Sequence, residues 1–124
     1  MRGLLGAREA PVVALVREDG SAVCERCTVA ATPLRRMKGL LGRSELPPGE
    51  GLLLRPASSI HTFFMRFPLD AVFLDRDLVV RKVVAAVKPW RLVFARRARS
   101  VLELAAGEAE RRGVAAGQRL ISQD

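Results

Sequence analysis

The chain has 124 residues and a formal charge of +8, from 21 Lys and Arg against 13 Asp and Glu. This length suits one domain and is too short for two of ordinary size. Because 49% of the residues are hydrophobic and 27% are charged, the composition excludes a disordered chain. The single histidine, His61, excludes metal sites and catalytic centres that need two histidines from one chain.

The N-terminal part of the sequence predicts a β-hairpin. We expect a single domain over residues 1–124, in which residues 1–10 form a flexible N-terminal segment. Residues 11–17 and 21–30 are rich in Val and other residues that favour strands. Between them, Asp19-Gly20 is a strong hairpin signal, because both turn positions tolerate a positive φ. The two runs should therefore pair as antiparallel strands.

A short amphipathic helix is expected next. Thr32 is a favourable N-cap and Pro33 suits the first helical position. Gly42 lies where a C-cap glycine belongs. The apolar side chains of this segment recur at helical spacing and share one face: Leu34, Met37 and Leu41. The pattern predicts a helix over residues 33–41 whose apolar face packs on a sheet.

The remaining sequence alternates short apolar runs with turns. These runs cover residues 52–54, 60–65, 71–74 and 78–87. A basic connector over residues 91–99 then leads to a predicted strand at 101–104, a short helix at 108–112 and a last strand at 120–121. Short strands without long helical crossovers favour a sandwich or barrel over βαβ units. The sequence therefore predicts a mainly β fold with one or two short helices at its edge.

Six motifs follow one another in an order shared with a known family. They are MKGLLGR at 37–43, GLLL at 51–54, FFMR at 63–66, PLDAVFLD at 68–75, VLELAAG at 101–107 and GVAAG at 113–117. Together they resemble the domain of unknown function 192 (DUF192) family. That family usually has Phe-Trp-Met-Lys where this chain has Phe63-Phe64-Met65-Arg66, and Asp where it has Gln118. The resemblance implies a compact, jelly-roll-like β-sandwich or barrel and no established activity.

The two cysteines form a Cys24-x-x-Cys27 pair inside a predicted strand. Residues three apart on a strand face opposite sides and lie about 10 Å apart, beyond the reach of a disulfide. Two cysteines and one histidine also leave a zinc ligand set incomplete. We therefore expect no metal and no cofactor, and we interpret both cysteines as small packing residues.

Four residues are candidates for a ligand site: Arg66, Asp70, Trp90 and Glu103. The three charged ones interrupt or border apolar runs, and burying a charge is costly unless it is paired. In the functional interpretation they line a pocket that binds a polar ligand or carries out acid–base chemistry, with Trp90 as a wall. In the structural interpretation a salt bridge or backbone cap fixes the strand register. His61, the only imidazole, is an acid–base candidate or a histidine at a sheet edge.

The densest basic cluster is Arg91, Arg96, Arg97 and Arg99, with only Trp90 and Phe94 nearby for stacking. We interpret it as a solvated loop, with nucleic-acid binding that is weak, sequence-independent and sensitive to salt. No apolar stretch approaches the length of a membrane span, so we expect a cytoplasmic protein with no membrane partner.

These observations favour a small β-sandwich module that binds a small polar ligand or a protein partner without chemistry of its own. One alternative is a small enzyme that uses Asp70 and Glu103, with His61, as acid–base groups. A second alternative is a nucleic-acid-associated basic protein.

Overall fold

The structure of the protein is a computed structural model that describes residues 10–124. Residues 1–9 and the side chains of Leu34 and Met37 lie outside this description. The prediction of a flexible segment over residues 1–10 and most of the predicted apolar helix face therefore fall outside the described part. Leu41, the third residue of that face, packs against a buried apolar cluster.

Nine strands and two short helices make up the described part of the chain. In chain order they are β1 (Val12–Arg17), β2 (Ala22–Ala30), α1 (Pro33–Lys38), β3 (Glu50–Leu54), β4 (Ser59–His61), β5 (Leu69–Leu74), β6 (Val80–Val87), β7 (Leu92–Phe94), β8 (Ser100–Ala105), α2 (Glu108–Arg111) and β9 (Leu120–Gln123). The prediction of a mainly β fold with short edge helices is confirmed.

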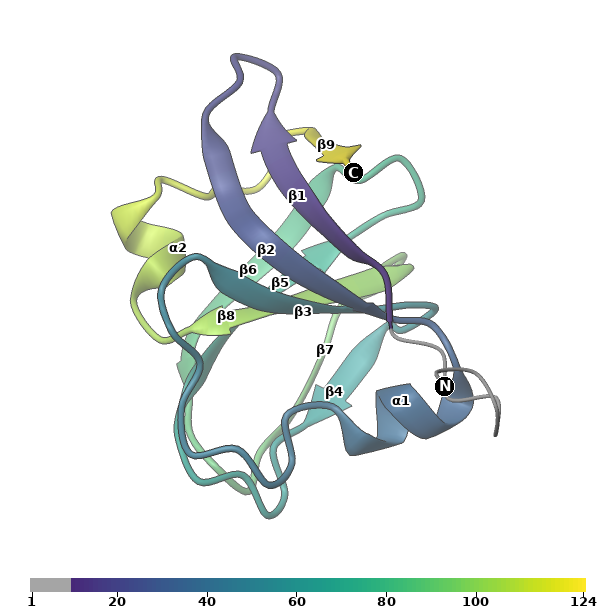
Figure 1. The fold of residues 1–124 in the computed structure, drawn as a ribbon, viewed down its shortest axis with the longest axis vertical. Coiled ribbons are helices and arrows are strands. Elements are labelled where there is room, and N and C mark those ends of the chain that lie inside the picture. Colours follow the sequence, from purple (N-terminus) through teal and green to yellow (C-terminus); the bar gives the residue numbers. More distant parts are fainter. Residues whose placement is uncertain (1–9) are drawn as a thin grey trace, which may run out of the picture.

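Seven strands form one curled sheet in the order β6-β5-β8-β3-β2-β1-β9, and β4 and β7 form a separate pair. Neighbouring strands are antiparallel except for β2 and β3. A bridge between Val79 and Arg119 links the two ends of the large sheet. In Figure 1, α1, β4 and β7 lie below β3 and β8, and α2 lies at the side of the sheet. The architecture is that of a curled sheet that approaches a barrel.

The large sheet has an apolar cluster on each face, because successive residues of a strand point to opposite sides. Val72 and Leu74 of β5 belong to the cluster on the face of α2, together with Ala109 of that helix. Ala71 and Phe73 belong to the other cluster, which includes Leu40 and Ile60. Every residue of β5 is buried, so a charged residue on this strand needs partners or a cavity.

Three predicted boundaries differ from the structure. The helix α1 ends at Lys38, because Gly39 leaves the helical conformation with a φ of +49° and a ψ of −126°, so Gly39 and not Gly42 is the C-cap. The strand β4 ends at His61, since the chain turns at the next residue. The segment expected to be a basic connector contains β7, where Val93 alone points inward opposite Ile60. A strand is recognised in a sequence by alternating apolar and polar residues, and a single inward residue among arginines is too short a pattern to predict one.

The prediction that Cys24 and Cys27 face opposite sides of β2 is wrong. Leu15 pairs with Cys24 and Val13 with Cys27, so the two residues between the cysteines stand opposite the single residue Ala14 of β1. This bulge turns both thiols into the same buried cluster, where both are free. A hydrogen bond with Cys24, together with burial, raises the pKa of Cys27. A Cβ on Gly51 would lie 2.8 Å from Cys24 Sγ, so this thiol fills space against β3.

Candidate functional site

Asp70 holds three parts of the fold together. Its side chain is completely buried, and its carboxylate accepts hydrogen bonds from backbone N–H groups only. Oδ1 accepts from Ala86 at 2.8 Å, where β6 bulges opposite β5. Oδ2 accepts from Gly107 at 3.0 Å and Ala109 at 2.9 Å, at the start of α2. Charge-assisted bonds of this kind are the stronger ones, and here they fix α2 and the end of β6 relative to β5.

The strand register separates Asp70 from Glu103. Asp70 pairs with Leu104 across β5 and β8, and Ala71 pairs with Glu103. Because paired residues share a face and neighbours alternate, the two carboxyl groups point to opposite faces of the sheet. The structure therefore does not bring these two candidates into one site.

Glu103 is a buried carboxyl group on β8. Only 5% of its surface is exposed, and Leu52 and Ala71 flank it on the neighbouring strands. Among the described residues, none forms a hydrogen bond or an ion pair with its side chain. Burial raises the pKa of Glu103 from its ordinary 4.5 to about 8. The group is therefore mainly protonated at neutral pH and can donate a hydrogen bond.

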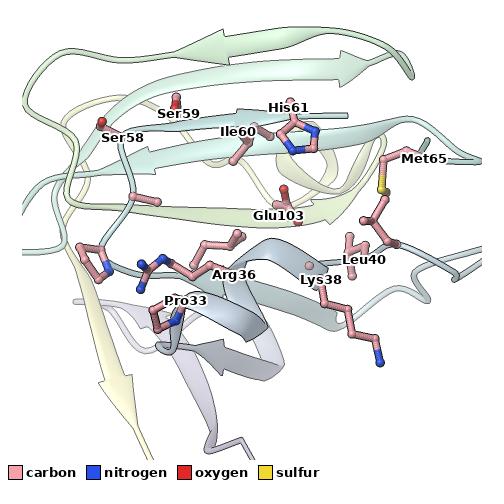
Figure 2. Close-up of a pocket in the computed structure, with 15 residues that line it drawn as sticks. Pro33, Arg36, Lys38, Leu40, Ser58, Ser59, Ile60, His61, Met65 and Glu103 are labelled. Carbon is pink, nitrogen blue, oxygen red and sulfur yellow. The ribbon is translucent and has the colours of Figure 1, made fainter. Parts of the chain in front are cut away.

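The Glu103 carboxyl group lies at the floor of a pocket of about 380 Å³. Its walls come from α1 and the turn after it, from β4, and from the segment that joins β3 to β4. Figure 2 shows the Glu103 side chain pointing from β8 into the space between β4 and α1. The apolar part of the lining includes Leu40, Leu54, Ile60 and Met65. We call this cavity the Glu103 pocket.

Polar groups lie along the walls of the Glu103 pocket. The hydroxyl-bearing Ser58 and Ser59 line it, and so does His61, whose Nδ1 accepts a hydrogen bond from the Phe63 N–H at 3.3 Å. Arg36 donates from Nη1 to the carbonyl of Ala31 at 3.1 Å. Lys38 extends away from Glu103 in Figure 2. The structure thus brings His61 and Glu103 to one cavity and places Arg36 on its wall.

The other two candidates, Arg66 and Trp90, do not line the Glu103 pocket. Both are exposed, and Trp90 packs on Phe63 and Phe64. No ion pair joins Arg66 to Asp70 or Glu103 in the part of the chain that the structure describes. The sequence also gave no sign of Arg36, Ser58 and Ser59 as lining residues, because these segments meet β8 only through the fold.

Two further features limit what the described part of the chain can hold. It contains no group of three or more His, Cys, Asp or Glu side chains placed to bind a metal ion. None of its helices is both long enough and apolar enough to cross a membrane.

The fold and the pocket define a small β protein with a single ionisable carboxyl group buried beneath a cavity. The chain belongs to the DUF192 family, described as "Uncharacterized ACR, COG1430", whose pattern matches residues 14–122. This confirms the resemblance found in the sequence. No curated protein matches the chain.

Two solved structures share the fold. One is a protein from Sinorhizobium meliloti called a "putative transcription regulator", with 26% identity, a TM-score of 0.81, and coverage of 94% of this chain and 98% of that one. The other is a protein of unknown function from Novosphingobium aromaticivorans, with 23% identity, a TM-score of 0.76, and coverage of 98% and 91%. Neither name defines a chemical activity.

Replacing Asp70 should lower stability. Asp70→Asn keeps the volume but places an amide NH₂ against a backbone N–H, so the free energy of unfolding should fall by about 1–3 kcal/mol. Urea denaturation measures this loss. Asp77→Asn, at an exposed turn position, is the matched control and should change stability by less than about 0.5 kcal/mol. Equal stability of both variants and the wild type would contradict the capping role.

The stability of the protein should fall as the pH rises toward 8. Folded Glu103 keeps its proton up to about pH 8, whereas the unfolded chain loses it near 4.5, so the folded state binds more protons between these values. The contribution from Glu103 to this fall is at most about 1.4 kcal/mol per pH unit. Urea denaturation across this range should show it.

Variants separate the contribution of Glu103 from that of the other titratable groups in the protein. Glu103→Gln should remove the slope that Glu103 contributes, and Glu45→Gln, at an exposed position, should retain it. Parallel pH profiles for the wild type and Glu103→Gln would show that the carboxyl group is not buried in its neutral form.

Proposed function

We propose that this protein binds a small polar molecule in the Glu103 pocket and does not catalyse a reaction on it. The observation that carries the proposal is the buried carboxyl group of Glu103 at the floor of an open cavity. Removing this carboxyl group from bulk water disfavours its charged form, which raises its pKa to about 8 and costs free energy at neutral pH. A ligand that bonds to Glu103 would offset this cost, which is a physical reason for the group to remain there.

The protonation of Glu103 specifies the ligand further. With a pKa of about 8, the group donates a hydrogen bond at neutral pH, so the ligand offers an acceptor such as a carbonyl or carboxylate oxygen. Arg36, on the wall of the pocket, favours a negative charge nearby. The apolar walls accept a hydrocarbon part. Small organic acids and carbonyl compounds combine these features.

Binding is favoured over catalysis because Asp70 lies on the other face of the sheet, bonded to the backbone. A second candidate function, acid–base catalysis by Glu103 with His61, rests on the fact that both line the pocket. The buried cysteines suit a reducing compartment, so we propose a cytoplasmic location. The name of the Sinorhizobium meliloti relative suggests that ligand binding serves a regulatory role.

Native mass spectrometry of the protein purified from its own cells tests the proposal. The wild type should retain a small molecule, and Glu103→Gln, which keeps a donor and an acceptor of similar size, should retain it as well. Glu103→Leu should lose the molecule, because it removes both hydrogen-bonding roles. Glu45→Leu, at an exposed position, is the control and should retain it. An unloaded wild type, or equal loading of Glu103→Leu, would contradict ligand binding through Glu103.

A further inference from the structure

The turn after β4 and the turn before β7 lie at the same end of this strand pair and present three aromatic rings to solvent. These rings, of Phe63, Phe64 and Trp90, are called the aromatic cluster. The ring centroids of Phe63 and Trp90 lie 5.7 Å apart, and those of Phe64 and Trp90 lie 4.7 Å apart. Phe64 is 70% exposed and Trp90 is 57% exposed. Large rings gathered at a surface in this way mark a binding site.

The backbone holds this cluster at an energetic cost. Phe64 has a φ of +67° and Trp90 a φ of +68°, in the left-handed region that bulky residues rarely adopt. The buried Thr62 links the two turns: its hydroxyl donates to the Lys88 carbonyl at 2.6 Å and accepts from the Arg91 N–H at 2.8 Å. Its carbonyl accepts from the Trp90 N–H at 2.9 Å. Strain that surrounding structure maintains in this way is typical of functional sites.

The two segments of the chain that supply the aromatic cluster carry only positive charges. Residues 51–69 and 78–102 contain nine of the 21 Lys and Arg and no Asp or Glu. The rest of the chain is nearly neutral, with the other 12 Lys and Arg against 13 Asp and Glu. Three of the nine cations, Arg66, Lys88 and Arg91, are exposed and lie in the same turns as the rings. Charge complementarity therefore requires an anionic partner.

From these observations we infer that the aromatic cluster and its neighbouring cations bind single-stranded nucleic acid. Bases stack on the exposed faces of Phe64 and Trp90, while the phosphates contact Arg66, Lys88 and Arg91. In a single-stranded nucleic acid, planar bases alternate with negatively charged phosphates, and this arrangement matches aromatic rings that lie among cations. An acidic protein surface would supply the negative charges but not the regularly spaced planar rings. The binding is independent of base sequence, and it uses a surface whose rings come from two separate segments of the chain.

Fluorescence tests this inference directly, because Trp90 is the only tryptophan of the chain. The protein is titrated with an oligothymidylate of about 12 nucleotides. Stacking should quench the Trp90 emission. The affinity should fall steeply between about 50 and about 200 mM salt, because phosphate contacts release counterions. A duplex of the same length, whose bases are already stacked, should bind more weakly and quench less.

Variants identify the rings and cations involved. Fluorescence anisotropy of a labelled oligothymidylate should show that Trp90→Ala and Phe64→Ala each weaken binding by at least about fivefold. Ile121→Ala, an exposed apolar position on β9, is the matched control and should leave the affinity unchanged. Arg91→Gln should weaken binding and reduce its salt dependence, whereas Arg76→Gln, at an exposed turn with the same loss of charge, should have little effect.

Four results would contradict single-stranded nucleic-acid binding by the aromatic cluster. Equal affinity for duplex and single strand, or an unchanged affinity of Trp90→Ala, would leave only general electrostatic attraction. Tighter binding of polyglutamate would identify an acidic protein as the partner. A blue shift of Trp90 emission with phosphatidylglycerol vesicles, without quenching by oligothymidylate, would identify a lipid surface.

Discussion

The pairing of β5 with β8 determines where both buried carboxyl groups of these strands point. With Ala71 opposite Glu103, Asp70 faces the cluster beneath α2, and Glu103 faces the cavity beneath α1 and β4. A shift of one residue in this pairing would turn both carboxyl groups to the same face of the sheet. On the face of the Glu103 pocket, Asp70 would lose its three backbone N–H donors. The register is therefore the constraint on which the capping role and the pocket both depend.

The two carboxyl groups differ in their surroundings, and this difference gives them different properties. Asp70 receives three backbone hydrogen bonds and serves the fold. Glu103 receives none among the described residues, and burial raises its pKa to about 8. An apolar residue at this position would fill the space between Leu52 and Ala71 without the desolvation cost. We propose that a ligand accounts for the carboxyl group at this position, and the open cavity in front of it provides the room.

Local chemistry made much of the fold predictable. The Asp19-Gly20 turn, the Thr32 cap and the break at Gly107 each act over a few residues, so the hairpin and the start of each helix follow from the sequence. The bulge that turns Cys24 and Cys27 to one face depends on how β1 pairs with β2. This pairing cannot be predicted from the residues of β2 alone. Likewise, β7 is defined by its pairing with β4 rather than by its own three residues.

The candidate site was predictable only in part. Glu103, like Asp70, is identifiable as a charge within an apolar run, but its pocket is lined by segments far away in the chain, including α1 and Ser58. The aromatic cluster arises because Thr62 joins two turns about 27 residues apart, so no local pattern predicts it. Sequence reasoning identified charged residues that need a partner, and the fold determined which partner each one has.

The protonation state of Glu103 is the centre of this account, and nuclear magnetic resonance measures it directly. A titration of the side-chain carboxyl ¹³C signals, with Glu103 assigned by its absence in Glu103→Gln, reports the ionisation of this group alone. The account predicts a midpoint near pH 8 for the unliganded protein, well above its ordinary 4.5. A midpoint near 4.5 would contradict it, because the carboxyl group would then be solvated rather than buried beneath the pocket.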